Sequence, residues 1–264
     1  MAIDNVIKAN PTKDFFIKML TKDIPLTRAI IDLVDNSVDG ALRLRPNNDY
    51  SGLKVQLTIK DDEFVIEDNC GGIPLDVAKL YAFRFGRPKE AISTPNSVGL
   101  FGVGMKRAIF KMGNSFSVDS KTETDYFRVE QNIPAWSELE EWEFHFEEVK
   151  DATKVLNVYG TRIAIRELHG SISEQFKLKN FLINLRIQLE AAQQISLERG
   201  LTIVLNDVPL QPSMLYLYNT ESIQPGFASF ALDAYPKVNV AIYTGIFERD
   251  LVKGGWYLPL CQDR

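Results

Sequence analysis

The sequence predicts an α+β fold with enough apolar material for one large or two medium domains. Two observations support this prediction. Of the 264 residues, 45% are hydrophobic and 25% are charged, which is the balance of an ordinary globular protein. Segments with helical apolar spacing and segments with strand-like alternation both occur along the chain. We therefore expect helices packed on a sheet.

The chain is expected to begin with two helices followed by a hairpin. Residues 11–21 and 26–43 have helical spacing, and the Asp-Ile-Pro break at residues 23–25 separates them. Residues 53–59 alternate as a strand does, and residues 63–67 follow as the hairpin partner.

A loop and a run of strands come next. Residues 84–98 contain Gly86, Pro88 and Pro95 and are predicted as a loop between short helices at 76–83 and 103–112. Strands share the alternating pattern and are expected at 115–121, 124–131, 142–149 and 160–167.

The last part of the chain changes from helix to strand. Residues 172–194 have helical apolar spacing, and strand-like patterns resume at 201, with clear runs at 238–243 and 255–260. We expect a first domain over residues 1–198 and the beginning of a second, truncated one over 199–264.

Charge and cysteine content exclude several functional classes. The net charge is −5 and the isoelectric point about 5.3, which does not favour direct nucleic-acid binding. The two cysteines and two histidines have no metal-ligand spacing, and the cysteines indicate no disulfide scaffold. The sequence has neither a signal peptide nor a run of 18 apolar residues, so we expect a cytoplasmic protein without a membrane partner.

The second predicted helix carries a polar stripe. Asp32, Asn36 and Asp39 stand at i, i+4 and i+7, within roughly 60° of one another at 100° per residue. This pattern is also that of a solvated face of an amphipathic helix. We expect no basic partner one turn away from the stripe, which favours a functional interpretation. Oxygen ligands in such a stripe suit Mg²⁺, which takes one or two protein oxygens beside phosphates and water.

A turn with paired glycines follows the predicted hairpin. Asp68 precedes Gly71 and Gly72, whose positive φ angles would let a ligand approach the backbone. A carboxylate beside that gap can accept a hydrogen bond from an exocyclic amine such as adenine N6. A plain turn beginning with Asp-Asn explains the same residues equally well.

Three glycines precede the helix expected at 103–112. Gly99, Gly102 and Gly104 would leave bare backbone N–H groups at a helix N-terminus, where an anion such as phosphate binds, and Lys106 would add a mobile charge. The motif is neither a Walker loop nor a dinucleotide fingerprint, because Arg107 occupies the position of the third glycine. A structural turn is the alternative.

In this order, and with Gly160-Thr161 as the fourth motif, these segments resemble the GHKL superfamily of ATPases, which includes gyrase, the ninety-kilodalton heat-shock chaperone, histidine kinases and MutL. The resemblance covers about residues 10–170. It implies a two-layer α/β sandwich, the Bergerat ATP-binding fold, with a mixed sheet covered by helices. Residues 199–264 are similar to the beginning of a transducer domain. MORC-type and chaperone-like members are closer than histidine kinases, since no phosphoacceptor-histidine helix precedes the domain.

The resemblance also implies roles for individual residues. Asp32 would be the general base, although hydrolysing members carry Glu there, and Asn36 would bind Mg²⁺. Asp68 would bind adenine, and Cys70 replaces a glycine of the family pattern. The implied nucleotide contacts are Asn36, Asp39, Asp68, Gly72, Ile73, Gly99, Leu100, Phe101, Gly102, Val103, Gly104, Lys106 and Thr161.

The leading hypothesis is therefore a slowly hydrolysing ATPase with ATP and Mg²⁺ as cofactors, which acts as a conformational switch and forms an ATP-dependent homodimer. Residues 83–97 would form the ATP lid. Lys237 and Lys253 are candidates for the transducer lysine that reaches the γ-phosphate. The alternatives are a nucleotide-binding module without catalysis and a phosphotransfer domain of the histidine-kinase type.

Overall fold

The computed structural model describes residues 11–86, 104–155, 160–212, 219–232 and 235–246. The chain divides into two compact units, Met1–Pro212 and Ser213–Arg264. No helix among the described residues is long and apolar enough to cross a membrane.

The first unit is built on one eight-stranded sheet with the strand order β5-β4-β3-β6-β2-β1-β7-β8. Its neighbouring strands pair antiparallel except β1 and β7, which are parallel, so the sheet is mixed. The strands are β1 (Lys54–Ile59), β2 (Glu63–Asp68), β3 (Gly113–Lys121), β4 (Asp125–Asn132), β5 (Phe146–Asp151), β6 (Gly160–Leu168), β7 (Thr202–Leu205) and β8 (Val208–Pro209).

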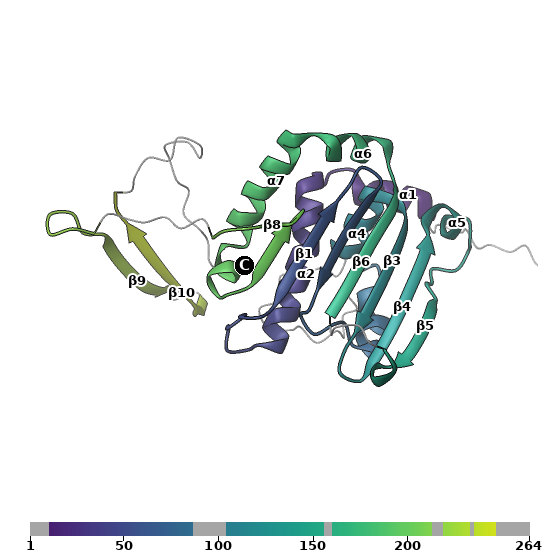
Figure 1. Ribbon diagram of the computed structural model, residues 1–264, viewed down its shortest axis with the longest axis horizontal. Helices are drawn as coiled ribbons and strands as arrows, with labels where there is room; N and C mark the ends of the chain where they lie inside the picture. The colour runs from purple at the N-terminus through teal and green to yellow at the C-terminus, as the bar shows by residue number, and fades with distance from the viewer. Residues whose placement is uncertain (1–10, 87–103, 156–159, 213–218, 233–234, 247–264) are drawn as a thin grey trace, which may run out of the picture. The chain divides into compact units, whose positions relative to one another are not determined.

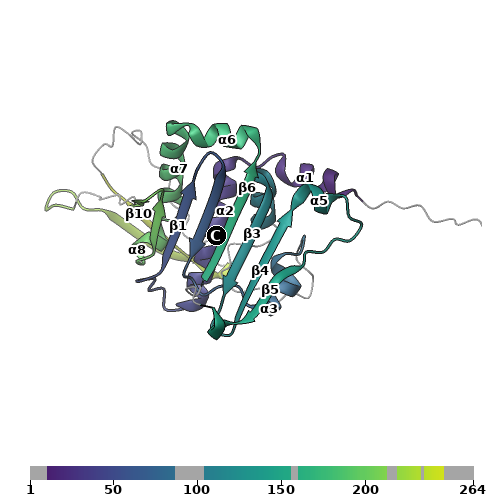
Figure 2. The ribbon, with the colours of Figure 1, turned by 45° about the vertical axis from the view of Figure 1, so that its right-hand side comes forward.

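Helices cover one face of this sheet. In Figure 1 and Figure 2, α2 (Leu26–Leu44) and α4 (Gly104–Met112) lie against the same face, with α1 (Lys13–Thr21) beside them. The predicted apolar side of α2 is confirmed, because Ile30, Leu33 and Val34 are buried in the core. Helices on one side of a mixed sheet confirm the predicted α+β two-layer architecture.

The opposite face of the sheet carries alternating charges. The registers place Glu67, Arg162, Asp119, Arg128 and Glu148 side by side across β2, β6, β3, β4 and β5. Arg128 donates to Asp119 at 3.0 Å from Nη1 to Oδ1, and Arg162 lies 3.6 Å from Glu67. Opposite charges in directly paired positions stabilise a solvated sheet face. This face therefore needs no second helical layer.

Several elements differ from the sequence expectation. The helix expected at 172–194 is three helices, α6 (Gly170–Lys177), α7 (Lys179–Ala192) and α8 (Gln194–Glu198), which break at Leu178 and Gln193. The apolar period continues across the first break because Phe176 and Leu185 enter the same core. A short helix, α5 (Ile133–Ser137), follows the Asn132 cap and was not expected.

The short helical segments are α3 (Leu75–Val77), η1 (Ala78–Ala82), which is a π-helix, and η2 (Ala152–Lys154). The expected strand at 142–149 begins later, at Phe146.

The second unit contains an antiparallel hairpin of β9 (Gly226–Leu232) and β10 (Tyr235–Thr244). The strand expected at 238–243 lies within β10, and the one at 255–260 lies outside the described residues. The units divide at Pro212, and β7 and β8 belong to the first sheet. A functional division into residues 1–198 and 199–264 stays a prediction.

Candidate functional site

Three of the segments singled out in the sequence meet at one end of the sheet. The Asp68 carboxylate, at the end of β2, accepts a hydrogen bond from Ser37 Oγ of α2 at 2.7 Å and another from the Thr161 backbone N–H of β6 at 3.2 Å. The start of α4 lies against α2, since a Cβ placed on Gly104 would stand 3.7 Å from the Asp32 Cβ. The tertiary structure thus brings α2, the turn after β2 and the start of β6 together, and the start of α4 lies beside the same helix.

Asp68 is a partly buried carboxylate that accepts hydrogen bonds from several donors. Its Oδ1 accepts from the Cys70 N–H at 2.9 Å as well as from Thr161, and its Oδ2 accepts from Ser37. Burial raises the pKa of Asp68, and these hydrogen bonds oppose that rise. A carboxylate has about four acceptor positions, so Oδ2 retains one for a further donor such as an exocyclic amine.

Ser120 links the turn to the start of β6. Its Oγ accepts from the Ile73 N–H at 2.7 Å and lies 3.3 Å from Thr161 Oγ1. Ile73 and Thr161 were predicted as nucleotide contacts, whereas Ser120 was not. Nothing in an alternating strand marks one serine as different, because its role depends on the neighbours that the sheet supplies.

The glycines around Asp68 permit close approach of one backbone segment to another. Gly72 has φ +74°, and a Cβ there would lie 2.3 Å from the Lys121 carbonyl oxygen. A Cβ on Gly160 would lie 1.8 Å from the Asp68 carbonyl oxygen. The positive φ expected at Gly72 is confirmed. The backbone that leaves no room for a Cβ at Gly72 is that of strand β3.

Gly40 and Cys70 form a similar contact. A Cβ on Gly40 of α2 would lie 2.7 Å from the Cys70 carbonyl oxygen, so the helix passes directly over the turn. The Cys70 side chain is buried at 2% exposure, and burial raises the pKa of its thiol. The turn therefore accommodates the side chain that replaces the glycine of the family pattern.

The expectation that the polar stripe has no basic partner is wrong. Arg28 stands four residues before Asp32, and its Nε lies 2.9 Å from Asp32 Oδ1. Arg107 of α4 approaches the other oxygen, with 3.0 Å between Nη2 and Oδ2. Arg28 is visible in the sequence at i−4, but the contact with Arg107 requires α4 to pack on α2.

Lys106 does not have the mobile position expected for it. Its side chain is 3% exposed, and Nζ donates to the Ala82 carbonyl oxygen, the last residue of η1, at 2.7 Å. Burial lowers the pKa of Lys106 to about 7. A lysine with this pKa changes its charge near neutral pH, while its contact with phosphate stays a prediction.

Asn36 fits the ligand expected for Mg²⁺. It is exposed on the same face of α2 as Asp32, and within the described residues no hydrogen bond engages its side-chain amide. The described residues contain no group of three His, Cys, Asp or Glu side chains that could hold a metal on their own. A single amide oxygen from Asn36 suits Mg²⁺, because this ion obtains its remaining ligands from phosphates and water.

Several predicted residues lie outside the described ranges. They are Gly99, Leu100, Phe101, Gly102, Val103, the lid from residue 87 onward and Lys253. Asp39 is described and is buried at 8% exposure.

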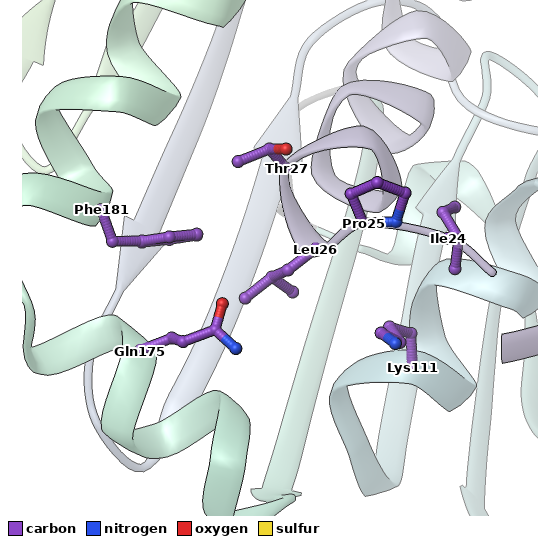
Figure 3. A pocket seen from close by; sticks show the side chains of 7 residues that line it. All are labelled: Ile24, Pro25, Leu26, Thr27, Lys111, Gln175 and Phe181. Atoms are coloured by element: carbon purple, nitrogen blue, oxygen red, sulfur yellow. The ribbon is translucent and has the colours of Figure 1, made fainter. Parts of the chain in front are cut away.

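A pocket of about 370 Å³ lies at the opposite end of α2 (Figure 3). Leu26 and Thr27 at the start of α2, Lys111 of α4, Gln175 of α6 and Phe181 of α7 line it, together with Ile24 and Pro25. None of the predicted nucleotide contacts is among these residues.

Comparisons with known proteins identify the family of the chain and structures with a similar fold. The profile of the family described as histidine kinase-, DNA gyrase B-, and HSP90-like ATPase matches residues 24–158. No curated protein sequence matches the chain. Two structures of the ATPase region of Saccharomyces cerevisiae topoisomerase II, one of them bound to ICRF-187 (dexrazoxane), superpose with a TM-score of 0.51 at 12% identity. Each alignment covers 70% of this chain and 48% of the other, so the chain matches about half the length of that region.

Proposed function

Since this chain belongs to the histidine kinase-, DNA gyrase B- and HSP90-like ATPases and contains a GHKL-type ATPase domain, we propose that it binds ATP with Mg²⁺ and hydrolyses it slowly to ADP and phosphate. The observation that supports this most strongly is the meeting of Ser37, Asp68 and Thr161, which joins three separate motifs in one hydrogen-bonded cluster. A surface helix with a solvated polar face would need no such cluster.

Each residue has a distinct part in the proposed site. Asp68 accepts a hydrogen bond from the adenine amine at the free position of Oδ2. Asn36 contributes an oxygen to Mg²⁺, which when bound offsets the charge of the phosphates. The N-terminus of α4 and Lys106 hold the phosphate groups. Such chemistry consists mainly of positioning and electrostatic stabilisation.

Asp32 is the proposed base that orients and deprotonates the attacking water. It lies beside Gly104 at the start of α4, where the phosphates would bind. Its side chain is one methylene shorter than the glutamate of hydrolysing members, which supports slow turnover. The alternative is a module that binds ATP without hydrolysing it, in which the contacts of Asp32 with Arg28 and Arg107 have only a structural role.

We further propose that nucleotide binding drives a change of conformation and association with a second copy of the chain, as in a chaperone- or MORC-like switch. Residues 199–264 would act as the beginning of a transducer-like domain. The cytoplasm is the proposed location.

Two variants with opposite expected signatures test the proposal. Asp32→Asn should abolish phosphate release while ATP affinity stays within a few-fold, because a base stabilises the transition state and not the ground state. Asn36→Ala should lose nucleotide binding, because it removes a magnesium ligand. The measurements are calorimetry with ATP and Mg²⁺ and single-turnover phosphate release.

Each result has a defined meaning. Loss of a base should slow hydrolysis by about 10²–10⁴. If Asp32→Asn releases phosphate at the wild-type rate, Asp32 is not the base. If the wild-type chain binds ATP and never releases phosphate, the non-catalytic alternative replaces the ATPase. No binding of ATP with Mg²⁺ would refute the whole assignment.

A further inference from the structure

A chain of polar contacts runs from the junction of α7 and α8 to Asp32. Gln193, between the two helices, donates from Nε2 to Asp35 Oδ1 at 2.6 Å. Asp35 Oδ2 lies 3.6 Å from Arg28 Nη2, and Arg28 Nε lies 2.9 Å from Asp32 Oδ1. The four side chains thus connect the end of α7 with the proposed base.

Arg28 is the central member of this chain of contacts. Its guanidinium uses two different nitrogens for two different carboxylates, Nε for Asp32 and Nη2 for Asp35. A planar guanidinium presents its donors in a rigid fork, so fixing one end of the group also fixes the other. The orientation of Asp35 is fixed in turn by its hydrogen bond from Gln193, whose side chain is buried at 3% exposure.

The orientation of the Asp32 carboxylate depends on these contacts. The terminal torsion of an aspartate is broad, so the side chain alone does not decide where its oxygens point. Arg28 holds Oδ1 and Arg107 holds Oδ2, and together they fix the plane of the carboxylate. A carboxylate has about four acceptor positions, so both oxygens can still accept from water.

We propose that Arg28 and Gln193 are positioning residues for ATP hydrolysis, which hold the carboxylate of Asp32 in the orientation needed to receive a proton from the attacking water. This inference rests on the proposed ATPase function. A misplacement of about 1 Å can cost a factor of about 10² in rate, and the short side chain of Asp32 makes its orientation more critical.

The test is single-turnover phosphate release and ATP affinity, measured on the full chain. Arg28→Gln should slow phosphate release about tenfold or more and change ATP affinity less than about threefold. Gln193→Leu should slow release several-fold. The double variant should be no slower than Arg28→Gln alone, because the two residues act in series on Asp32.

A matched control exists on α7. Arg186 forms an i,i+4 pair with Glu190 at 2.9 Å, and its side chain is 40% exposed compared with 37% for Arg28. Arg186→Gln removes a similar surface ion pair and should change neither release nor affinity. In both pairs the arginine is partly exposed and the carboxylate is largely buried, so the unfolding midpoints of Arg28→Gln and Arg186→Gln should lie within a few degrees of each other.

The outcomes separate this inference from the proposed function. If Asp32→Asn stops hydrolysis but Arg28→Gln leaves it at the wild-type rate, the positioning role is refuted and the ATPase stands. If wild type does not hydrolyse ATP, both fail. Should Arg28→Gln not fold, Arg28→Lys replaces it, since a single ammonium cannot bridge two carboxylates through separate nitrogens. A threefold or greater loss of rate in that variant supports the role, and an unchanged rate refutes it.

Discussion

Replacing Lys106 by methionine should stabilise the protein and at the same time weaken nucleotide binding. Lys106 is 3% exposed and its pKa is lowered by burial from 10.5 to about 7. Methionine has a similar length and carries no charge, so the variant avoids the free-energy cost of burying an ammonium group. A residue that costs stability in the empty protein is typical of a functional site.

The magnitude follows from the difference between the two pKa values. Lowering the pKa from 10.5 to about 7 corresponds to a penalty of about 5 kcal/mol on the charged folded state, at about 1.4 kcal/mol per pH unit. The variant also loses the hydrogen bond to the Ala82 carbonyl, which is worth about 1 kcal/mol. Lys106 has a further interaction that the variant also loses, so we expect a net gain of about 2–4 kcal/mol at pH 6.

The gain should depend on pH in a defined direction. Below about pH 7 Lys106 is charged in both states, and the full penalty of burial is present. Between about pH 7 and 10.5 the unfolded state binds more protons than the folded state, so wild-type stability rises with pH across this range. The advantage of Lys106→Met should therefore be largest below pH 7 and decline toward pH 10.5.

Urea denaturation of both proteins from pH 6 to pH 10, with ATP titrations beside it, provides the measurement. Lys111→Met is the control, because Lys111 lies on the same helix and donates to the Thr21 carbonyl at 3.1 Å. That variant should not be stabilised at pH 6. A Lys106→Met protein less stable than wild type at pH 6, or an advantage that stays constant up to pH 10, would refute the reasoning.

Three further predictions concern the surroundings of the site. Asp68→Asn should abolish the preference for adenine over guanine nucleotides. It should also lower the free energy of unfolding by about 1–3 kcal/mol, because the amide oxygen cannot accept from all three donors of Asp68. Equal affinity of the wild-type protein for both nucleotides would contradict this role. Gly160→Ala should lower the free energy of unfolding by about 3 kcal/mol or more in urea denaturation, since its Cβ would lie 1.8 Å from the Asp68 carbonyl oxygen. The control is Gly52→Ala, which has φ +82° and open space around it and should lower the same free energy by only about 1–2 kcal/mol. Similar losses in the two variants would show that the backbone around Gly160 relaxes. Lys13→Met should speed amide hydrogen exchange in α1. The reason is that Lys13 Nζ donates to the Trp136 carbonyl at 2.8 Å and lies 4.2 Å from the centroid of the Trp136 ring. An unchanged exchange rate would mean that apolar contacts alone hold the helix in place.

The outline of the fold could be predicted from local pattern. The polar stripe and apolar side of α2 follow from a period of 3.6 residues, and the β1–β2 hairpin follows from alternation on either side of a short turn. The breaks at Leu178 and Gln193 could not be predicted, because neither residue is a glycine or proline and the apolar spacing continues through the first break.

The candidate site shows the same division between local and tertiary information. The sequence by itself determined which residues are the candidates for the proposed chemistry, since Asp32, Asn36 and Asp68 stand in motifs defined by spacing. Only the tertiary structure decided how those groups are held, because Ser120, Arg107 and Gln193 reach the site from strands and helices far away in the chain. It also turned Lys106 from an expected surface charge into a buried amine, since burial depends on what packs over a residue and leaves no trace in its immediate neighbours.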